Sequence, residues 1–80
     1  MTITVRLFAI MAQSAKTGVL PLELPAGATV AAVRAALQGR FKDLPWPAGT
    51  MLAVNQEYAT AETALNAGDE VAIIPPVSGG

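Results

Sequence analysis

The residues best suited to chemistry lie at the end of the chain, in Pro75-Pro76-Val77-Ser78-Gly79-Gly80. The two prolines hold the backbone extended and cannot continue a sheet ladder. The two glycines carry no side chain, so another protein's backbone can approach them closely. Fully extended, such a segment reaches about 20 Å. We therefore predict a thin arm that delivers the α-carboxylate of Gly80 into a narrow active site. Gly79, the residue before Gly80, has no side chain and would fit there as well. Because small residues also gather at chain ends without any function, the tail alone leaves both interpretations open.

The side chains, in contrast, provide no catalytic group. The sequence contains neither cysteine nor histidine, which excludes disulfides, thiolate metal sites, persulfide carriage and histidine acid–base chemistry. Asp69 and Glu70 are adjacent, and neighbouring strand residues face opposite ways, so we interpret them as solvated turn charges. Ser14 and Ser78 have no histidine to activate them, and the glycines lack phosphate-loop spacing. We predict a chain that is not an enzyme on its own, with no bound cofactor and no metal site.

Composition sets further limits. Eighty residues with 52% hydrophobic content and a net charge of −1 correspond to one small domain with a compact core. The five basic residues are scattered, which argues against nucleic acid, and no apolar run reaches transmembrane length. The apolar opening Val5–Ala12 has no charged leader before it and begins with strand-like alternation. We expect a cytoplasmic protein without a membrane partner.

Alternating hydrophobicity predicts the strands. In residues 2–8, Ile3, Val5 and Leu7 fall on one face and Phe8 on the other. Residues 19–24 alternate as well, and a proline within them indicates an edge strand. We predict a third strand at 51–54, a short one beginning at Tyr58 after a turn at 55–57, and a last one at 70–74. In that last strand Ile74 points away from the core.

One helix is predicted, because Val30, Val33 and Leu37 recur at helical spacing after Thr29, a suitable N-cap. Gly39 and the residues after it indicate where the helix ends. We interpret residues 9–16 as a short helical turn or loop and 61–67 as a loose helical turn. Residues 44–49 form an irregular connection in which Trp46 plugs the rim of the core.

This order of elements predicts an α+β domain, with a mixed sheet and one main helix packed across it. The first and last strands are the most apolar, so we place them adjacent and parallel at the centre, which is a β-grasp arrangement. We assign residues 1–74 to this domain and 75–80 to the tail. Phe8, Tyr58 and Ile74 would then lie on the uncovered face, where they suit docking of a partner or are ordinary exposed hydrophobics.

Several segments together resemble the small subunit of molybdopterin synthase, a sulfur carrier. They are the opening Val5–Ala9, Val54-Asn55-Gln56, the stretch Leu65–Ala72 and the ending Pro75–Gly80. The resemblance spans the whole chain, and the ending is its most specific part. It implies a ubiquitin-like β-grasp fold and a heterotetrameric synthase in which a large subunit holds the active site.

The resemblance also implies how the tail is used. An E1-like enzyme would adenylate Gly80 with ATP, and a sulfur donor protein would convert it to a thiocarboxylate. The tail would then enter the large subunit and give sulfur to a pterin precursor during synthesis of the molybdenum cofactor. Phe8, Tyr58 and Ile74 match apolar contact positions of the family's docking face, and Pro75, Pro76, Val77 and Ser78 form the approach.

One departure and three alternatives accompany this interpretation. The family often carries an Arg-Glu pair in the first helical turn, where this chain has Met11-Ala12-Gln13-Ser14, so the resemblance implies no partner contact from that turn. The alternatives are a sulfur carrier for thiamine thiazole synthesis, a ubiquitin-like protein modifier, and a β-grasp interaction module whose tail has no chemical role.

Overall fold

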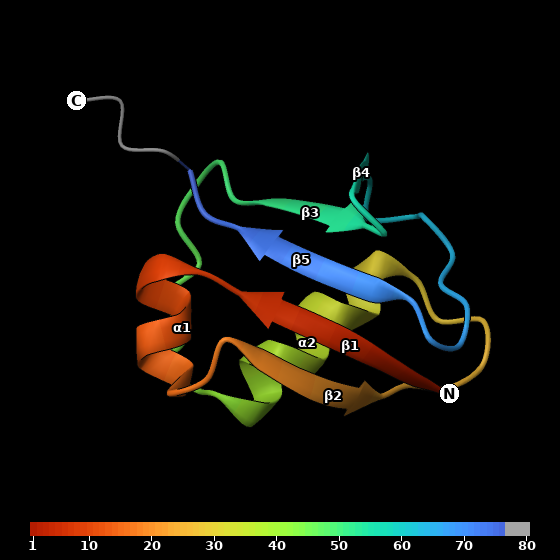
Figure 1. The fold of residues 1–80 in the computed structure, drawn as a ribbon, viewed down its shortest axis with the longest axis horizontal. Helices are drawn as coiled ribbons and strands as arrows, with labels where there is room; N and C mark the ends of the chain where they lie inside the picture. The colour runs from red at the N-terminus through yellow and green to blue at the C-terminus, as the bar shows by residue number, and fades with distance from the viewer. Residues whose placement is uncertain (77–80) are drawn as a thin grey trace.

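The architecture, described for residues 1–76 by a computed structural model, is one five-stranded mixed sheet with two helices on the same side (Figure 1). The strands follow the order β2-β1-β5-β3-β4 across the sheet. The elements in chain order are β1 (Thr2–Leu7), α1 (Ala9–Ala15), β2 (Val19–Glu23), α2 (Val30–Arg40), β3 (Met51–Val54), β4 (Glu57–Ala59) and β5 (Glu70–Ile74). The predicted α+β β-grasp arrangement is confirmed.

The first and last strands lie side by side at the centre, as predicted. β1 pairs with β5 in parallel, with Val5 opposite Val71 and Leu7 opposite Ile73. On one side of this central pair, β2 pairs antiparallel with β1. On the other side, β3 pairs antiparallel with β5. Because strand side chains alternate between faces, these apolar residues all enter one core, and Val5, Val71 and Ile73 are fully buried. Neighbours on both sides therefore hold β5, which leads into the tail, in place.

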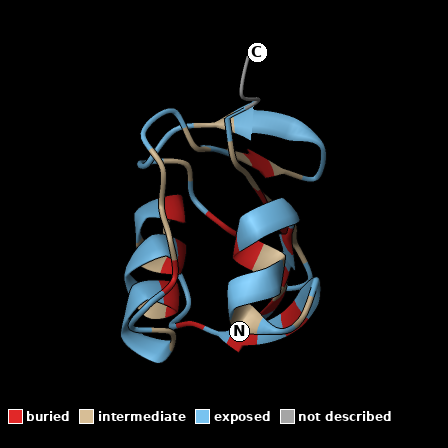
Figure 2. Cartoon of the chain, turned by 90° about the vertical axis from the view of Figure 1, so that its left-hand side faces the viewer, coloured by how far each residue is buried: buried red, intermediate tan, exposed pale blue. Residues whose placement is uncertain are grey.

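Helix α2 covers the inner face of the sheet through Val30, Val33 and Leu37, all buried as the helical spacing predicts. Figure 2 shows the buried residues of both helices on their inward sides and the exposed residues outside. Thr29 is the N-cap residue, but its side chain makes no capping hydrogen bond. Instead, the first amides of the helix donate to main-chain carbonyls of residues 61–63. The Val30 amide donates to the Thr63 carbonyl, and the Ala31 amide donates to the Ala61 carbonyl.

That contact corrects the prediction for residues 61–67, which do not form a helical turn. The segment contains tight turns at either end, and Ala64 forms an isolated antiparallel bridge with Thr29. Leu65 is buried, and its amide donates to the carbonyl of Ala28. Since carbonyls of this segment accept from α2, they are not available for helical hydrogen bonds of its own.

The segment predicted as a short helical turn or loop forms helix α1, which places the fully buried Met11 against the core. The helix ends at Lys16 in the left-handed conformation, where φ is 62°. The first strand ends at Leu7, one residue earlier than predicted. Phe8 keeps an extended backbone as the residue before α1, so its side chain stays on the outer face.

The connection from α2 to β3 supports the point where the chain leaves the sheet. Trp46 packs against the core cluster, as predicted for a plug, and the Arg34 guanidinium lies 4.9 Å from its ring centroid. Gly49 adopts a φ of 88°, and a methyl group there would lie 3.4 Å from Cβ of Pro76. A glycine at this position therefore lets the loop approach the first residues after β5.

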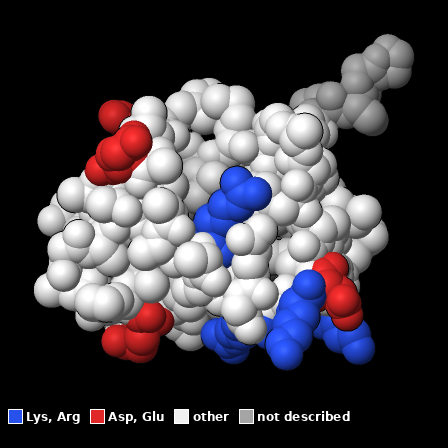
Figure 3. All heavy atoms as spheres, turned by 180° about the vertical axis from the view of Figure 1, so that it is seen from behind, with Lys and Arg blue, Asp and Glu red and all other residues white. Residues whose placement is uncertain are grey.

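On the helix-covered face most Lys and Arg side chains gather at the lower right with an acidic side chain beside them, and other acidic side chains lie apart on the left (Figure 3). Within residues 1–76, neither helix combines the length and apolarity needed to cross a bilayer.

The core contact of α2 gives a direct test. Replacing the fully buried Leu37 with alanine should lower the free energy of unfolding by about 2–5 kcal/mol, because a cavity is left under the sheet. The exposed neighbour Gln38 offers a matched control. Gln38→Ala should change the free energy of unfolding by less than about 0.5 kcal/mol. Urea unfolding followed by circular dichroism measures both. Equal effects would contradict the described packing.

Candidate partner-binding groove

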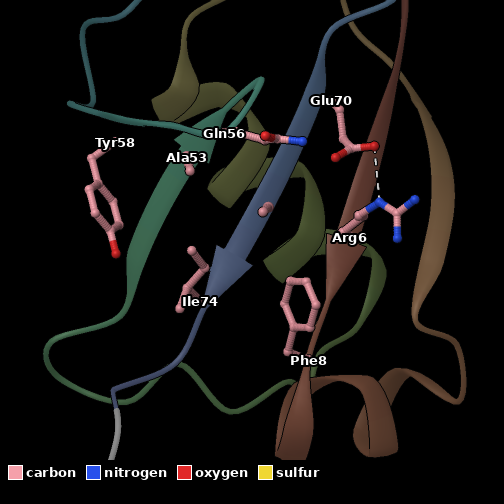
Figure 4. A pocket seen from close by; sticks show the side chains of 8 residues that line it. Arg6, Phe8, Ala53, Gln56, Tyr58, Glu70 and Ile74 are labelled. Atoms are coloured by element: carbon pink, nitrogen blue, oxygen red, sulfur yellow. Dashed lines mark ion pairs between the residues drawn. The ribbon is translucent and has the colours of Figure 1, made fainter.

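The sheet face opposite the helices carries a shallow groove of about 450 Å³. It runs across β1, β5, β3 and the β3–β4 turn, and Figure 4 shows its side chains on one side of the sheet. The lining residues are Arg6, Phe8, Ala53, Gln56, Tyr58, Glu70, Ala72 and Ile74. An open, largely apolar groove of this kind suits a protein partner, since nothing in residues 1–76 covers it.

Phe8, Tyr58 and Ile74, predicted on the uncovered face, do lie together at this groove. Phe8 and Tyr58 are 44% and 69% exposed, which is high for rings of this size. Between them the floor is made of small residues, because Ala53 of β3 pairs with Ala72 of β5. The result is an apolar depression between two aromatic side chains. That these residues contact a partner remains a prediction.

The other end of the groove is polar and was not predicted as part of the site. Arg6 Nε lies 2.9 Å from Glu70 Oε2 on the neighbouring strand. The amide end of Gln56 points across β5 toward Glu70 (Figure 4). The sequence did contain a signal for the pair. Because side chains alternate along a strand, Arg6 shares a face with Phe8 and Glu70 shares a face with Ile74, so both charges are expected on the outer face of the sheet. Our sequence interpretation of Glu70 as a solvated turn charge was incomplete.

A two-residue turn connects β3 to β4 and positions both Gln56 and Tyr58. Val54 pairs with Glu57, so Asn55 and Gln56 form the whole loop, with φ of 50° and 73°. Positive φ at both positions matches the twist of a tight hairpin, and asparagine tolerates it well. Gln56, in contrast, holds a conformation that glycine adopts with less strain. The turn is one residue shorter than the predicted 55–57, and β4 begins at Glu57 and not at Tyr58.

A hydrogen-bond cluster fixes this turn to the start of β5. Asn55 Nδ2 donates to Asp69 Oδ1 at 3.1 Å, and the Glu70 amide donates to Asn55 Oδ1 at 3.0 Å. The Asn66 amide donates to the second oxygen of Asp69 at 2.8 Å. The Asn66 amide first, and the Asn55 side chain second, hold the pKa of Asp69 below its ordinary value of 3.8. The cluster thus ties the hairpin that carries Tyr58 to the central strand.

The tail begins beside the groove. Pro75 and Pro76 follow Ile74 directly, and Pro76 lies against Gly49. Val77, Ser78, Gly79 and Gly80, which we predicted to approach and to carry the reactive carboxylate, lie outside the described residues. In residues 1–76 no group of acidic side chains is arranged to hold a metal ion.

The sheet order, the helix across it and the open outer face define a ubiquitin-like β-grasp protein. The solved structure of SAMP1 from Haloferax volcanii matches this chain with a TM-score of 0.87 and 30% identity over 100% of both chains. A chain in the complex of subunits 1 and 2 of the molybdopterin-converting factor from Helicobacter pylori 26695 matches with a TM-score of 0.72 and 26% identity, again over 100% of both.

Sequence comparison supplies the family. The profile of the ThiS family matches residues 5–80, so the chain belongs to the ThiS family. It is 40% identical to the molybdopterin synthase sulfur carrier subunit of Arabidopsis thaliana over 67 residues, which is 80% of this chain and 70% of the relative. It is also 58% identical to the protein of the same name from Dictyostelium discoideum over 33 residues, 39% of this chain and 38% of that relative. The resemblance found in the sequence is confirmed at the level of the family.

The Asp69 cluster predicts a pH dependence. A carboxyl with a lowered pKa in the folded state adds stability above its unfolded pKa, and this contribution is lost as the pH falls through the folded pKa. Asp69→Asn should therefore be less stable than wild type at about pH 6. The difference in stability between the two proteins should shrink as the pH falls below 3.8, the ordinary pKa of this carboxyl. Thermal unfolding across this range measures the effect. A difference that stays constant with pH would contradict it.

The strained turn makes a second prediction. Gln56→Gly should raise the free energy of unfolding by about 0.5–1 kcal/mol, because relief of the left-handed strain exceeds the added backbone entropy of glycine. Gln13→Gly, inside helix α1, is the control and should be destabilising by about the same amount. Loss of stability in Gln56→Gly would show that the turn is not strained.

Proposed function

We propose that this chain is the sulfur-carrying small subunit of molybdopterin synthase, with Gly80 as the C-terminal residue that carries sulfur. The observation that supports it best is the combination of a family match that runs to Gly80 with two relatives that bear the name of this subunit. The groove at the base of the tail supports it further, because a carrier must dock while its end is being modified.

The proposed chemistry needs no side chain of this protein. A carboxylate is a poor acyl electrophile, so an E1-like enzyme first joins it to ATP, and the carboxylate oxygen displaces pyrophosphate to form an acyl adenylate. Sulfide supplied by a sulfur donor protein then attacks the acyl carbon, the bond to AMP breaks and AMP leaves, so that Gly80 ends in a thiocarboxylate. The thiocarboxylate is a nucleophile that holds sulfur without cysteine, which agrees with a sequence that has none.

The synthase reaction would then take place in the large subunit. Pro75, Pro76, Val77, Ser78 and Gly79 would pass through a narrow channel there, and Gly80 would give its sulfur to cyclic pyranopterin monophosphate to form molybdopterin. Phe8, Tyr58 and Ile74 would contact the large subunit during this step. A chain that matches this one occurs in a complex of subunits 1 and 2 of the molybdopterin-converting factor, which supports a large-subunit partner. We place the assembled heterotetramer in the cytoplasm.

A second candidate function is favoured by one observation. The high structural similarity to SAMP1 extends to other structures of this small archaeal modifier protein. A modifier would also activate Gly80, but an acceptor amine on another protein would take the acyl group in place of sulfur transfer. The thiamine sulfur carrier stays as a further alternative, since the matching family profile is that of ThiS.

Removal of the last residue tests the proposal. A strain that carries the chain without Gly80 should lose molybdoenzyme activity, while the purified variant unfolds at the same temperature as wild type. Protein isolated from its own cells should contain a form heavier by about 16 Da, the change expected when sulfur replaces one carboxylate oxygen. The control is Gly39→Ala in α2, where an added methyl meets open space, and it should keep full activity.

The same strain separates the alternatives. A protein modifier predicts isopeptide-linked conjugates on lysines that disappear with Gly80, and a thiazole carrier predicts a requirement for thiamine. Full molybdoenzyme activity without Gly80 would overturn the proposed function.

A further inference from the structure

The ion pair at the polar end of the groove has to be accommodated when a partner docks. The side chains of Arg6 and Glu70 are 51% and 38% exposed, so water now solvates both. Phe8 lies two residues beyond Arg6 on the same face, and a partner that covers the ring also covers the pair. Removing an ion pair from water is unfavourable unless its remaining donors and acceptors find new partners. The docked surface must therefore supply polar groups at this end.

The orientation of Arg6 indicates which group is needed. Glu70 contacts Nε, and the two terminal nitrogens point away from Glu70 (Figure 4). A guanidinium is planar and offers its donors as a fork that fits a carboxylate with two parallel hydrogen bonds. The Nε contact restricts this fork before docking, which lowers the entropy lost on binding.

Gln56 provides an independent observation at the same end. Its φ of 73° is a strained conformation for a residue with a side chain, and a glycine would avoid the strain. Strained backbone conformations cluster at functional positions, which makes the Gln56 side chain a candidate for one. Its amide end lies over β5 toward Glu70, inside the groove. An amide both donates and accepts, so it can bind a polar group of the partner on the side of Glu70 away from the Arg6 fork (Figure 4).

We propose that Arg6, held by Glu70, is a carboxylate-binding end of the groove, which receives an aspartate or glutamate side chain of the large subunit, and that Gln56 binds a neighbouring polar group of the same partner. Apolar side chains next to that acid occupy the depression between Phe8 and Tyr58. The apolar half provides most of the binding free energy, and the carboxylate sets the register in which the partner lies across the sheet. This inference rests on the proposed function, because it takes the large subunit as the protein that docks.

Binding of the full-length chain to the large subunit from the same cells tests the inference by calorimetry at low and high salt. Arg6→Met keeps the length of the side chain without the charge and should weaken binding about tenfold, with a smaller dependence on salt. Arg6→Lys should also weaken it, since an ammonium cannot form the two-bond contact. The matched control is Arg40→Met in α2, on the opposite side of the sheet, which removes the same charge and should leave binding unchanged.

Gln56 separates recognition from structure. Gln56→Gly should weaken binding about threefold, by loss of one hydrogen bond, although the same change stabilises the fold. A purely structural residue would not move affinity and stability in opposite directions. Neutralising the acids of the large subunit one at a time should identify one whose effect is not additive with Arg6→Met.

The outcomes distinguish the inference from the function on which it rests. If wild type binds the large subunit and Arg6→Met binds with equal affinity and equal salt dependence, the carboxylate-binding end is overturned and the proposed function stands. If wild type does not bind the large subunit, the proposed function is overturned, and the inference with it.

Discussion

Parallel pairing of the first and last strands is the constraint on which the rest of this structure depends. It buries Val5, Val71 and Ile73 completely against helix α2. The same register brings the outward residues of β1 and β5 together on the opposite face, so that Arg6 and Phe8 lie near Glu70 and Ile74. One set of hydrogen bonds therefore builds the core on one face and the groove on the other. It also fixes where the tail leaves the domain.

The division of the groove into an apolar half and a polar end follows from this register. Alanines at the centre keep the floor low, and aromatic side chains on either side provide contact area. Apolar contact of this kind contributes affinity but is not directional, so a partner could shift along the sheet without losing it. An ion pair with directed donors fixes the position of the partner. A protein that docks on a partner can use the first for affinity and the second for orientation.

Much of this could be predicted from sequence, because the signals are local. Two-residue alternation marks the strands, and the spacing of Val30, Val33 and Leu37 marks α2. The shape of 61–67 could not be predicted, because its carbonyls accept from the amides of α2, a contact between distant segments. The Arg6–Glu70 pair requires the register between the first and last strands, and the strain at Gln56 requires the length of the hairpin loop. For the site, sequence identified the apolar residues but not the polar end.

The central place of β5 has a mechanical consequence. The strand is joined to β1 on one side and β3 on the other, and the chain continues from its end through Pro75 and Pro76. A force applied along β5 shears its hydrogen bonds to both β1 and β3. These hydrogen bonds then bear the force together and do not break one after another. A domain held in this way resists unfolding when it is pulled from the end of β5.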